Sequence, residues 1–284
     1  MILAAFFVMG IPVVGQILQE PQSFSSDAVF HAMERAYPSW VKVRQADGIS
    51  TMAVDGKDFV WASGRILGPE QQDHWQEFAP QPFYPYPRQL PDVGSWSDEQ
   101  VAAVEGRLAQ RRSAAPRRES QFFDTLWGIH DRATADASQK RIRFFGLRVT
   151  VHKSLEAPLA RIQTKLQAAR NGDRTLDAFL KTLVELDGYN WRSIAETQSR
   201  SNHAYGAAID IIPKSYRGKN PYWLWAPQEH PGWYRTAWAQ RWEPHIALIQ
   251  AFEDEGFIWG GKWLLFDTIH FEYRPEILVL NGLR

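Results

Sequence analysis

Residues 201–210 read Ser-Asn-His-Ala-Tyr-Gly-Ala-Ala-Ile-Asp, and residues 267–272 read Asp-Thr-Ile-His-Phe-Glu. Together the two strings offer the imidazoles of His203 and His270 and the carboxylate of Asp210 as ligands for a divalent metal. Asp267 adds a carboxylate three residues before the last imidazole. Three protein ligands, an open position for water and a neighbouring base are the components of a hydrolytic zinc site.

Asp210 stands inside the apolar run from residue 207 to residue 212, which predicts a buried strand. An ionised carboxylate there is costly unless it is paired or binds a metal, although backbone N–H groups or an arginine could also satisfy it. His203 lies seven positions earlier, and Gly206 permits a turn that brings the two side chains together. With a second histidine after a hairpin, the pattern favours a metal site, and zinc fits this donor set best.

Asp267 is the first candidate for the catalytic base, because a carboxylate beside the metal can take a proton from the attacking water and deliver one to the leaving amine. Glu272 is the competing base. It lies two residues beyond His270, and residues two apart on a regular strand share one face. A purely positioning role for both acids is the third alternative. Arg192 is a candidate for holding a substrate carboxylate or the developing oxyanion, against the alternative of a surface salt bridge.

Substrate contacts are predicted mainly in and after the first string. Ser201 could bind substrate or only shape the turn, and Tyr205 in the same string is a further candidate. Eight of the 13 tryptophans lie between residues 191 and 263, and most of them are expected to be structural. The best candidates for substrate binding stand in the presumed loop between the two strings: Tyr222, Trp223 and Trp225.

The composition is that of a globular protein. The 284 residues suffice for one large domain or two modest ones, with 44% apolar and 23% charged residues. Lys+Arg and Asp+Glu both number 32, so the zero net charge gives no general attraction to nucleic acid or to an anionic membrane. The absence of cysteine excludes disulfides, thiolate nucleophiles and cysteine-held zinc.

Residues 1–26 are predicted to be a signal peptide or a retained membrane anchor. Ile2 to Val14 is apolar and a polar run follows, as in a secretory signal, although the basic start is missing. The apolar stretch is shorter than the roughly 20 residues that a membrane span needs. We therefore expect an exported protein of the periplasm, the cell envelope or the medium, with a possible membrane tether; a buried N-terminal segment is the alternative.

Residues 27–139 are predicted to form an extension. Its expected elements are a helix at 27–37, an antiparallel β-meander at 40–61, a Pro/Tyr arm at 80–91, an interrupted helical stretch at 98–127 and a loop at 132–141. The arm contains five prolines, so it cannot be a central strand, and its aromatic residues need cover.

Residues 140–284 are predicted to form the catalytic domain. Its expected elements are a strand at 144–151, a helix with Leu155, Leu159, Ile162 and Leu166 on one face, a second helix through Leu183 that closes near Gly188, a strand at 189–192, the strand at 207–212, a helix from Pro244 to Gly256, and a hairpin that pairs 257–259 with 263–266.

The strings at 201–210, 256–263 (Gly-Phe-Ile-Trp-Gly-Gly-Lys-Trp) and 267–272, in this order, resemble the D-alanyl-D-alanine carboxypeptidase family of zinc peptidases. That family includes carboxypeptidases of the vancomycin-resistance type and L-alanyl-D-glutamate endopeptidases. The likeness covers about residues 145–278. It implies Zn²⁺ held by His203, Asp210 and His270, Asp267 as the catalytic carboxylate, and Ser201 as a substrate contact.

The resemblance also implies an α+β fold shared with the hedgehog signalling domain, a small antiparallel sheet flanked by helices, here with the N-terminal β-meander and helical extension added. Carboxypeptidase relatives commonly carry Glu in place of Asp267, so the Asp version looks more like the endopeptidase branch. The family places its catalytic Arg in a Gly-Tyr-Arg-Ser type of string well upstream of the first histidine. Arg192 is the best match, at a shortened spacing of eleven residues before His203.

These features imply a zinc peptidase that acts on peptidoglycan or its stem peptides, as a carboxypeptidase or an endopeptidase. The alternative is a non-hydrolytic, zinc-containing module of the same fold that binds cell wall or a partner protein. A metal-free structural domain is the third possibility. The presence of Asp267 favours the enzyme.

Overall fold

The computed structural model describes residues 24–284 except 47, 89–96, 113–115, 195–198 and 226–235. The predicted signal peptide or anchor therefore lies almost wholly outside the described residues, and export stays a prediction. Within the described part of the chain, no helix is both long and apolar enough to cross a membrane.

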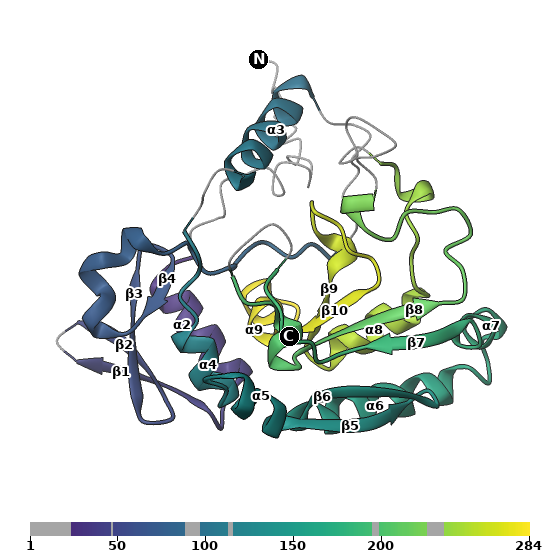
Figure 1. Ribbon diagram of the computed structural model, residues 1–284, viewed down its shortest axis with the longest axis horizontal. Coiled ribbons are helices and arrows are strands. Elements are labelled where there is room, and N and C mark those ends of the chain that lie inside the picture. Colours follow the sequence, from purple (N-terminus) through teal and green to yellow (C-terminus); the bar gives the residue numbers. More distant parts are fainter. Residues whose placement is uncertain (1–23, 47, 89–96, 113–115, 195–198, 226–235) are drawn as a thin grey trace, which may run out of the picture.

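The extension begins with a helix and an antiparallel β-meander, as predicted (Figure 1). Its elements are α2 (Ser26–Ala36), β1 (Val41–Ala46), β2 (Ile49–Val54), β3 (Lys57–Ala62) and β4 (Arg65–Leu67). Ser25 caps α2 by accepting a hydrogen bond from the backbone N–H of Ala28 at 3.2 Å. Asp55 and Gly56 both adopt positive φ between β2 and β3, which is the geometry of a tight hairpin turn.

Residues 80–88 of the Pro/Tyr arm form no helix or strand, and an isolated bridge at Ala79 precedes them. The helical stretch predicted after it is two helices, α3 (Asp98–Arg112) and α4 (Gln121–Trp127). The arm packs onto the second half of the chain: the backbone N–H of Trp259 donates to the Tyr86 hydroxyl at 2.8 Å, and that hydroxyl donates to Glu253 at 2.5 Å. The expected cover for its aromatic residues is therefore confirmed.

Residues 132–141 are not the predicted loop. They form α5 (Arg132–Ser138) and the start of β5 (Gln139–Phe144), which pairs with β6 (Leu147–His152). Asp131 begins the helix by a reciprocal cap with Thr134. The strand is polar because most of β5 is exposed or only partly buried, so it lacks the apolar alternation that predicts strands.

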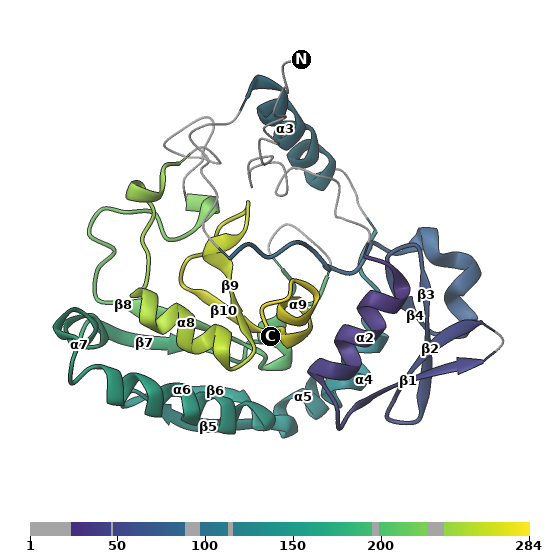
Figure 2. The ribbon, with the colours of Figure 1, turned by 180° about the vertical axis from the view of Figure 1, so that it is seen from behind.

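The second half of the chain contains an antiparallel sheet in the order β7-β8-β10-β9. Its strands are β7 (Leu183–Asp187), β8 (Ala208–Pro213), β9 (Phe257–Trp259) and β10 (His270–Tyr273). The accompanying helices are α6 (Glu156–Ala169), α7 (Arg174–Leu180), α8 (Ile246–Asp254) and α9 (Pro275–Leu280). Small antiparallel sheets flanked by helices confirm the predicted α+β class (Figure 2).

Four local predictions in this half are corrected. Leu183 opens β7 opposite Pro213 rather than closing the second helix. Residues 189–192 are not a strand, because the β7–β8 ladder ends at the pair Asp187 and Asp210. Strand β9 pairs with β10 and not with 263–266, since the 3-10 turn Gly260–Lys262 diverts the chain. Helix α8 begins after its cap His245, so Pro244 precedes it.

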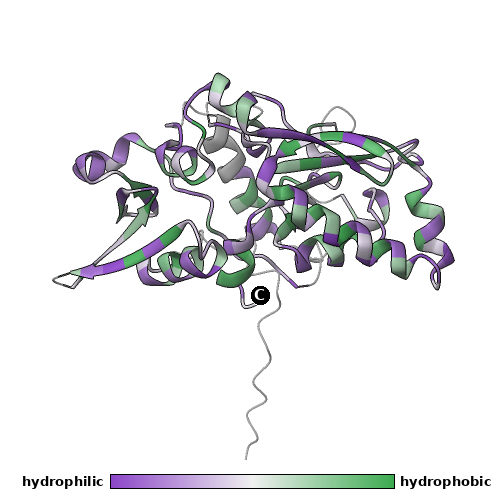
Figure 3. Cartoon of the chain, turned by 90° about the horizontal axis from the view of Figure 1, so that it is seen from below, coloured by the Kyte–Doolittle hydropathy of each residue, from purple (hydrophilic) through white to green (hydrophobic). Residues whose placement is uncertain are grey.

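One apolar cluster runs through the described residues on both sides of the predicted boundary between 139 and 140. Phe252 of α8 is fully buried, and its ring centroid lies 4.3 Å from Phe271 and 5.1 Å from Phe257. Tyr37 after α2 donates a hydrogen bond to Glu276 of α9 at 2.9 Å. Apolar and polar residues alternate around the helices and along the strands (Figure 3), as expected for elements with one buried face. The domain boundary itself stays a prediction.

Candidate metal centre

Two neighbouring strands supply the first two candidate ligands. In the ladder between β8 and β10, Asp210 lies directly opposite His270. Side chains at such paired positions are close neighbours on one face of the sheet. Here His270 Nδ1 lies 2.8 Å from Asp210 Oδ1. Residues sixty positions apart in the sequence are thus brought together by strand register.

A tight turn supplies the third ligand. His203 lies in the 3-10 helix Asn202–Tyr205, which Ser201 caps and which ends at Gly206 with φ +66°. A Cβ at Gly206 would come within 2.6 Å of the backbone nitrogen of His152, so only glycine fits. His203 Nε2 then lies 3.2 Å from both Asp210 Oδ1 and His270 Nδ1. One donor atom from each of the three residues lies within 4.8 Å of the others.

Hydrogen bonds on the outer side of each imidazole orient the metal-facing nitrogen. His203 Nδ1 lies 2.5 Å from the carbonyl oxygen of Gly188, which can only accept, so Nδ1 carries the proton and Nε2 faces the cluster. His270 uses the opposite nitrogens. Its Nε2 lies 3.2 Å from Glu272 Oε2, which leaves Nδ1 for the cluster. Such outer partners of metal-binding histidines typically set the ring orientation.

Glu272 lies behind His270 and not in front of it. Its Oε2 accepts a hydrogen bond from Asn202 at 2.6 Å, and its Oε1 lies 3.6 Å from Arg274. Burial opposes ionisation, but the hydrogen bond and charge of His270, together with Arg274, lower the pKa of Glu272 to about 2. An ionised carboxylate with these partners orients His270, and the placement favours Asp267 over Glu272 as the base.

Asp210 carries the negative charge that a cation site needs. Burial by itself would raise its pKa, but the charge and hydrogen bonds of His203 and His270 hold the pKa of Asp210 well below its usual range. The same contacts with Asp210 and Glu272 outweigh burial and raise the pKa of His270 well above its usual value. Two imidazole nitrogens and one carboxylate oxygen converge here, and this donor set fits zinc with one position left open.

Asp267 presents an unsatisfied oxygen beside this group. Its backbone N–H donates to the Gly260 carbonyl at 3.0 Å, while its buried Oδ1 has no hydrogen-bond partner among the described residues. Burial raises the pKa of Asp267 to about 7; His270, His203 and Arg192 act to lower it, and Asp210 to raise it. An orphaned buried carboxyl oxygen next to three converging donors fits a centre that takes a cation and water.

Arg192 and Ser201 lie near the group. The Arg192 side chain is exposed, and its charge acts on the carboxyl of Asp267. Its carbonyl oxygen accepts a hydrogen bond from the backbone N–H of Ser201 at 3.1 Å. The Ser201 hydroxyl accepts one from the backbone N–H of His203 at 3.3 Å, which supports the turn-shaping alternative. A substrate role for either residue stays a prediction.

Tyr205 and Trp223 have other partners. The buried Tyr205 hydroxyl donates to Asp124 Oδ1 at 2.8 Å. Trp223 is buried in a small apolar cluster with Val104 and Phe266. A substrate role for Tyr205 and Trp223 stays a prediction.

Sequence reasoning missed three contributors to the centre. The Gly188 carbonyl orients His203, and the Asn202 side chain donates to Glu272, which orients His270. Tyr216 is partly buried, and burial followed by the charges of Asp210 and Asp267 raises its pKa, which places its hydroxyl in the field of the centre. Asn202 stands within the string at 201–210 and Gly188 was expected only to close a helix, so their contacts with His203 and Glu272 are revealed by the tertiary structure alone.

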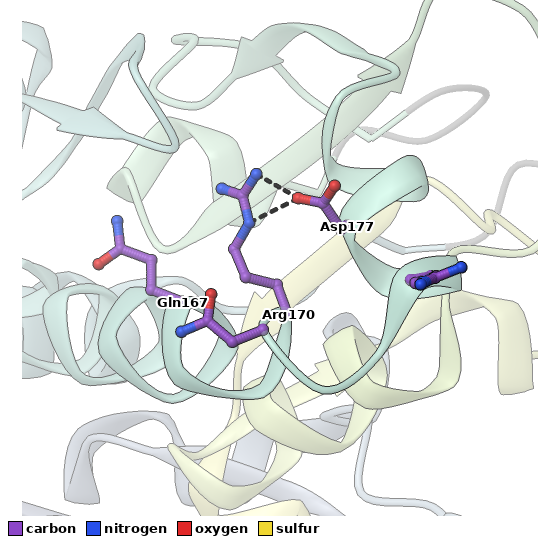
Figure 4. A pocket seen from close by; sticks show the side chains of 5 residues that line it. Gln167, Arg170 and Asp177 are labelled. Carbon is purple, nitrogen blue, oxygen red and sulfur yellow. Dashed lines mark hydrogen bonds and ion pairs between the residues drawn. The ribbon is translucent and has the colours of Figure 1, made fainter.

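A separate surface hollow between α6 and α7 carries no such chemistry. Gln167, Arg170 and Asp177 lie along it, and Arg170 Nε donates to Asp177 at 2.8 Å (Figure 4). This ion pair satisfies both groups, so the hollow offers no convergent donors.

Comparison with known families relates the segment that carries this site to a class of zinc peptidase. Residues 195–273 match the family model described as D-alanyl-D-alanine carboxypeptidase. The match includes His203, Asp210, Asp267 and His270, and it confirms the family resemblance drawn from the three strings. Residues 195–273 are therefore similar to this zinc-peptidase family, and they contain a His-Asp-His group that could bind a metal. No solved structure matches the chain.

Proposed function

We propose that this protein is a zinc-dependent peptidase that hydrolyses peptidoglycan stem peptides, with D-alanyl-D-alanine carboxypeptidase-like or L-alanyl-D-glutamate endopeptidase-like action. The observation that carries the proposal is the buried carboxyl of Asp267, whose Oδ1 lacks a partner beside the His-Asp-His group. A module that only held a metal would not need this acid. The family match supports the same class of reaction.

His203, Asp210 and His270 would hold Zn²⁺. Bound there, zinc supplies the Lewis acidity that makes water a nucleophile near neutral pH. Asp267 takes the proton of the attacking water and returns it to the nitrogen of the leaving amine. Arg192, whose charge reaches this carboxyl, stabilises the developing oxyanion or a substrate carboxylate.

The proposed substrate requires an exported protein. Peptidoglycan lies outside the cytoplasmic membrane, and the apolar stretch Ile2 to Val14 supports export or tethering to the membrane. The partners are accordingly peptidoglycan or its peptides.

Asp267→Asn tests the function because it keeps the shape of the side chain and removes the base. We expect one zinc per chain by elemental analysis, as in the wild type, and a loss of turnover of about 10²- to 10⁴-fold. Mass spectrometry of purified muropeptides gives the readout: loss of a terminal D-Ala indicates a carboxypeptidase, and an internal cut an endopeptidase. Asp254→Asn, at an exposed acid paired with Lys165, is the matched control and should retain full activity.

Two results would refute the proposal. The first is full activity of the Asp267→Asn variant. The second is a zinc-loaded wild-type protein that leaves every muropeptide intact, which would instead support the non-hydrolytic binding module.

A further inference from the structure

The segment that follows β8 returns along one edge of the metal centre. The backbone N–H of Trp223 donates to the Phe266 carbonyl at 2.9 Å, and that of Thr268 donates to the Pro221 carbonyl at 2.7 Å. Tyr222 forms an antiparallel bridge with Asp267. These contacts hold residues 221–223 directly beside the proposed base.

Three aromatic rings lie on this edge, and we call Tyr216, Tyr222 and Trp225 the aromatic shelf. Trp225 is 52% exposed, which is unusual for so large an apolar side chain. The ring of Tyr216 stands 6.1 Å from Trp225 at 66°, and that of Tyr222 stands 6.0 Å away at 85°. Trp242, which is buried, supports Tyr216 from 5.7 Å. The exposed indole is therefore held by its neighbours.

The shelf is continuous with the metal centre. Tyr222 bridges Asp267 through the backbone, and the hydroxyl of Tyr216 lies in the field of Asp210 and Asp267. A ligand bound on the shelf would therefore lie next to the segment that carries Asp267.

The surroundings of the shelf carry positive charge. Lys214, Arg217 and Lys219 are exposed on either side of Tyr216, and none of them forms an ion pair within the described residues. Besides Asp210 and Asp267 of the metal centre, Glu185 acts on Tyr216, and Lys219 acts on Glu243. Three unpaired cations beside an aromatic surface favour a ligand with a flat apolar face and attached carboxylates.

We propose that the aromatic shelf binds a sugar ring of a peptidoglycan fragment while the attached anionic stem peptide reaches the metal centre. Alanine and glutamate offer no large apolar side chain for an exposed indole, whereas a sugar ring has a flat C–H face and polar edges. An indole provides rigid contact area with the same division into an apolar face and a polar edge. The shelf thus makes the enzyme prefer glycan-linked over free peptide. This inference rests on the proposed function and adds its substrate preference.

The test compares one stem peptide in two forms, free and linked to its N-acetylated disaccharide. The wild type should have a higher kcat/KM for the linked form. In Trp225→Ala this preference should fall about 3- to 10-fold, through KM for the linked substrate, and Trp225→Phe should restore most of it. Ile49→Ala, which removes an exposed apolar side chain in β2, is the control and should keep the preference.

An unchanged preference in Trp225→Ala would overturn the shelf, and so would an equal fall of kcat for both substrates, which would mark Trp225 as structural. A wild type that cleaves neither form refutes the proposed function instead. In that case calorimetric titration of the zinc-loaded protein with the disaccharide-peptide tests whether the shelf binds the sugar. Binding that Trp225→Ala weakens would support it, and no binding, or binding that the variant leaves unchanged, would overturn it.

Discussion

Replacing Glu272 with alanine should weaken zinc binding about 10- to 100-fold, although Glu272 is not a proposed ligand. Its Oε2 lies 3.2 Å from His270 Nε2, on the far side of the ring from Asp210. A hydrogen bond to a charged group is worth about 1.5–3 kcal/mol, which corresponds to this range of affinity. Without the hydrogen bond to Glu272, the His270 imidazole can rotate, or its proton can move to Nδ1, the nitrogen that should face the metal.

The fold should survive the change. Arg274 loses one partner, but it keeps its ion pair with Glu276 and its hydrogen bond to the Pro82 carbonyl. Thermal unfolding of the metal-free proteins checks this point. Glu272→Gln keeps an acceptor for His270 and should lose less than about 10-fold in affinity.

Competition with a chromophoric chelator at fixed pH gives the zinc Kd, and ¹⁵N spectra of the imidazoles report the protonated nitrogen of His270. Glu253→Ala is the matched control, because Glu253 also pairs with a cation and a tyrosine hydroxyl but does not contact a ligand histidine. If Glu272→Ala folds normally and binds zinc as tightly as the wild type, the positioning role is wrong.

Two further predictions concern stability. Metal-free protein should lose stability as the pH rises from about 3.8 to about 7, because burial raises the pKa of Asp267 and the folded state binds this proton more tightly than the unfolded state. Urea unfolding of the wild type and of Asp267→Asn isolates the effect. A difference in unfolding free energy between the two proteins that stays constant across this pH range would contradict the prediction. Tyr86→Phe should cost about 1–3 kcal/mol in urea unfolding, since the buried N–H of Trp259 and Glu253 both lose their partner on the arm; a loss below about 0.5 kcal/mol would show that other contacts hold the arm.

Elements with a strong local signal were predicted well. Strand β8 is an apolar run, and the buried residues of α6 recur on one helical face, so each pattern reflects the core that the element contacts. The turn before β8 depends on Gly206, whose positive φ is a local requirement. The meander was likewise marked by a turn signal at residues 55–56.

Elements whose pairing is not marked by local apolar alternation were predicted poorly. Strand β5 is polar and is identified only by its pairing with β6. Residues 263–266 have the composition of a strand, yet β9 pairs with β10, because the turn at Gly260–Lys262 separates them. The partner of β9 is set by packing in the four-stranded sheet, which a short window of sequence does not contain.

The two strings at 201–210 and 267–272 by themselves determined which side chains can ligate a metal and which acid stands beside them, because donor chemistry and a glycine turn are local properties. Only the tertiary structure decided that His203 and His270 present opposite nitrogens, that Glu272 supports a ligand from behind, and that Trp225 is exposed while Trp223 is buried. The physical reason is that orientation and exposure are set by contacts between segments far apart in the chain, here strand register and ring packing.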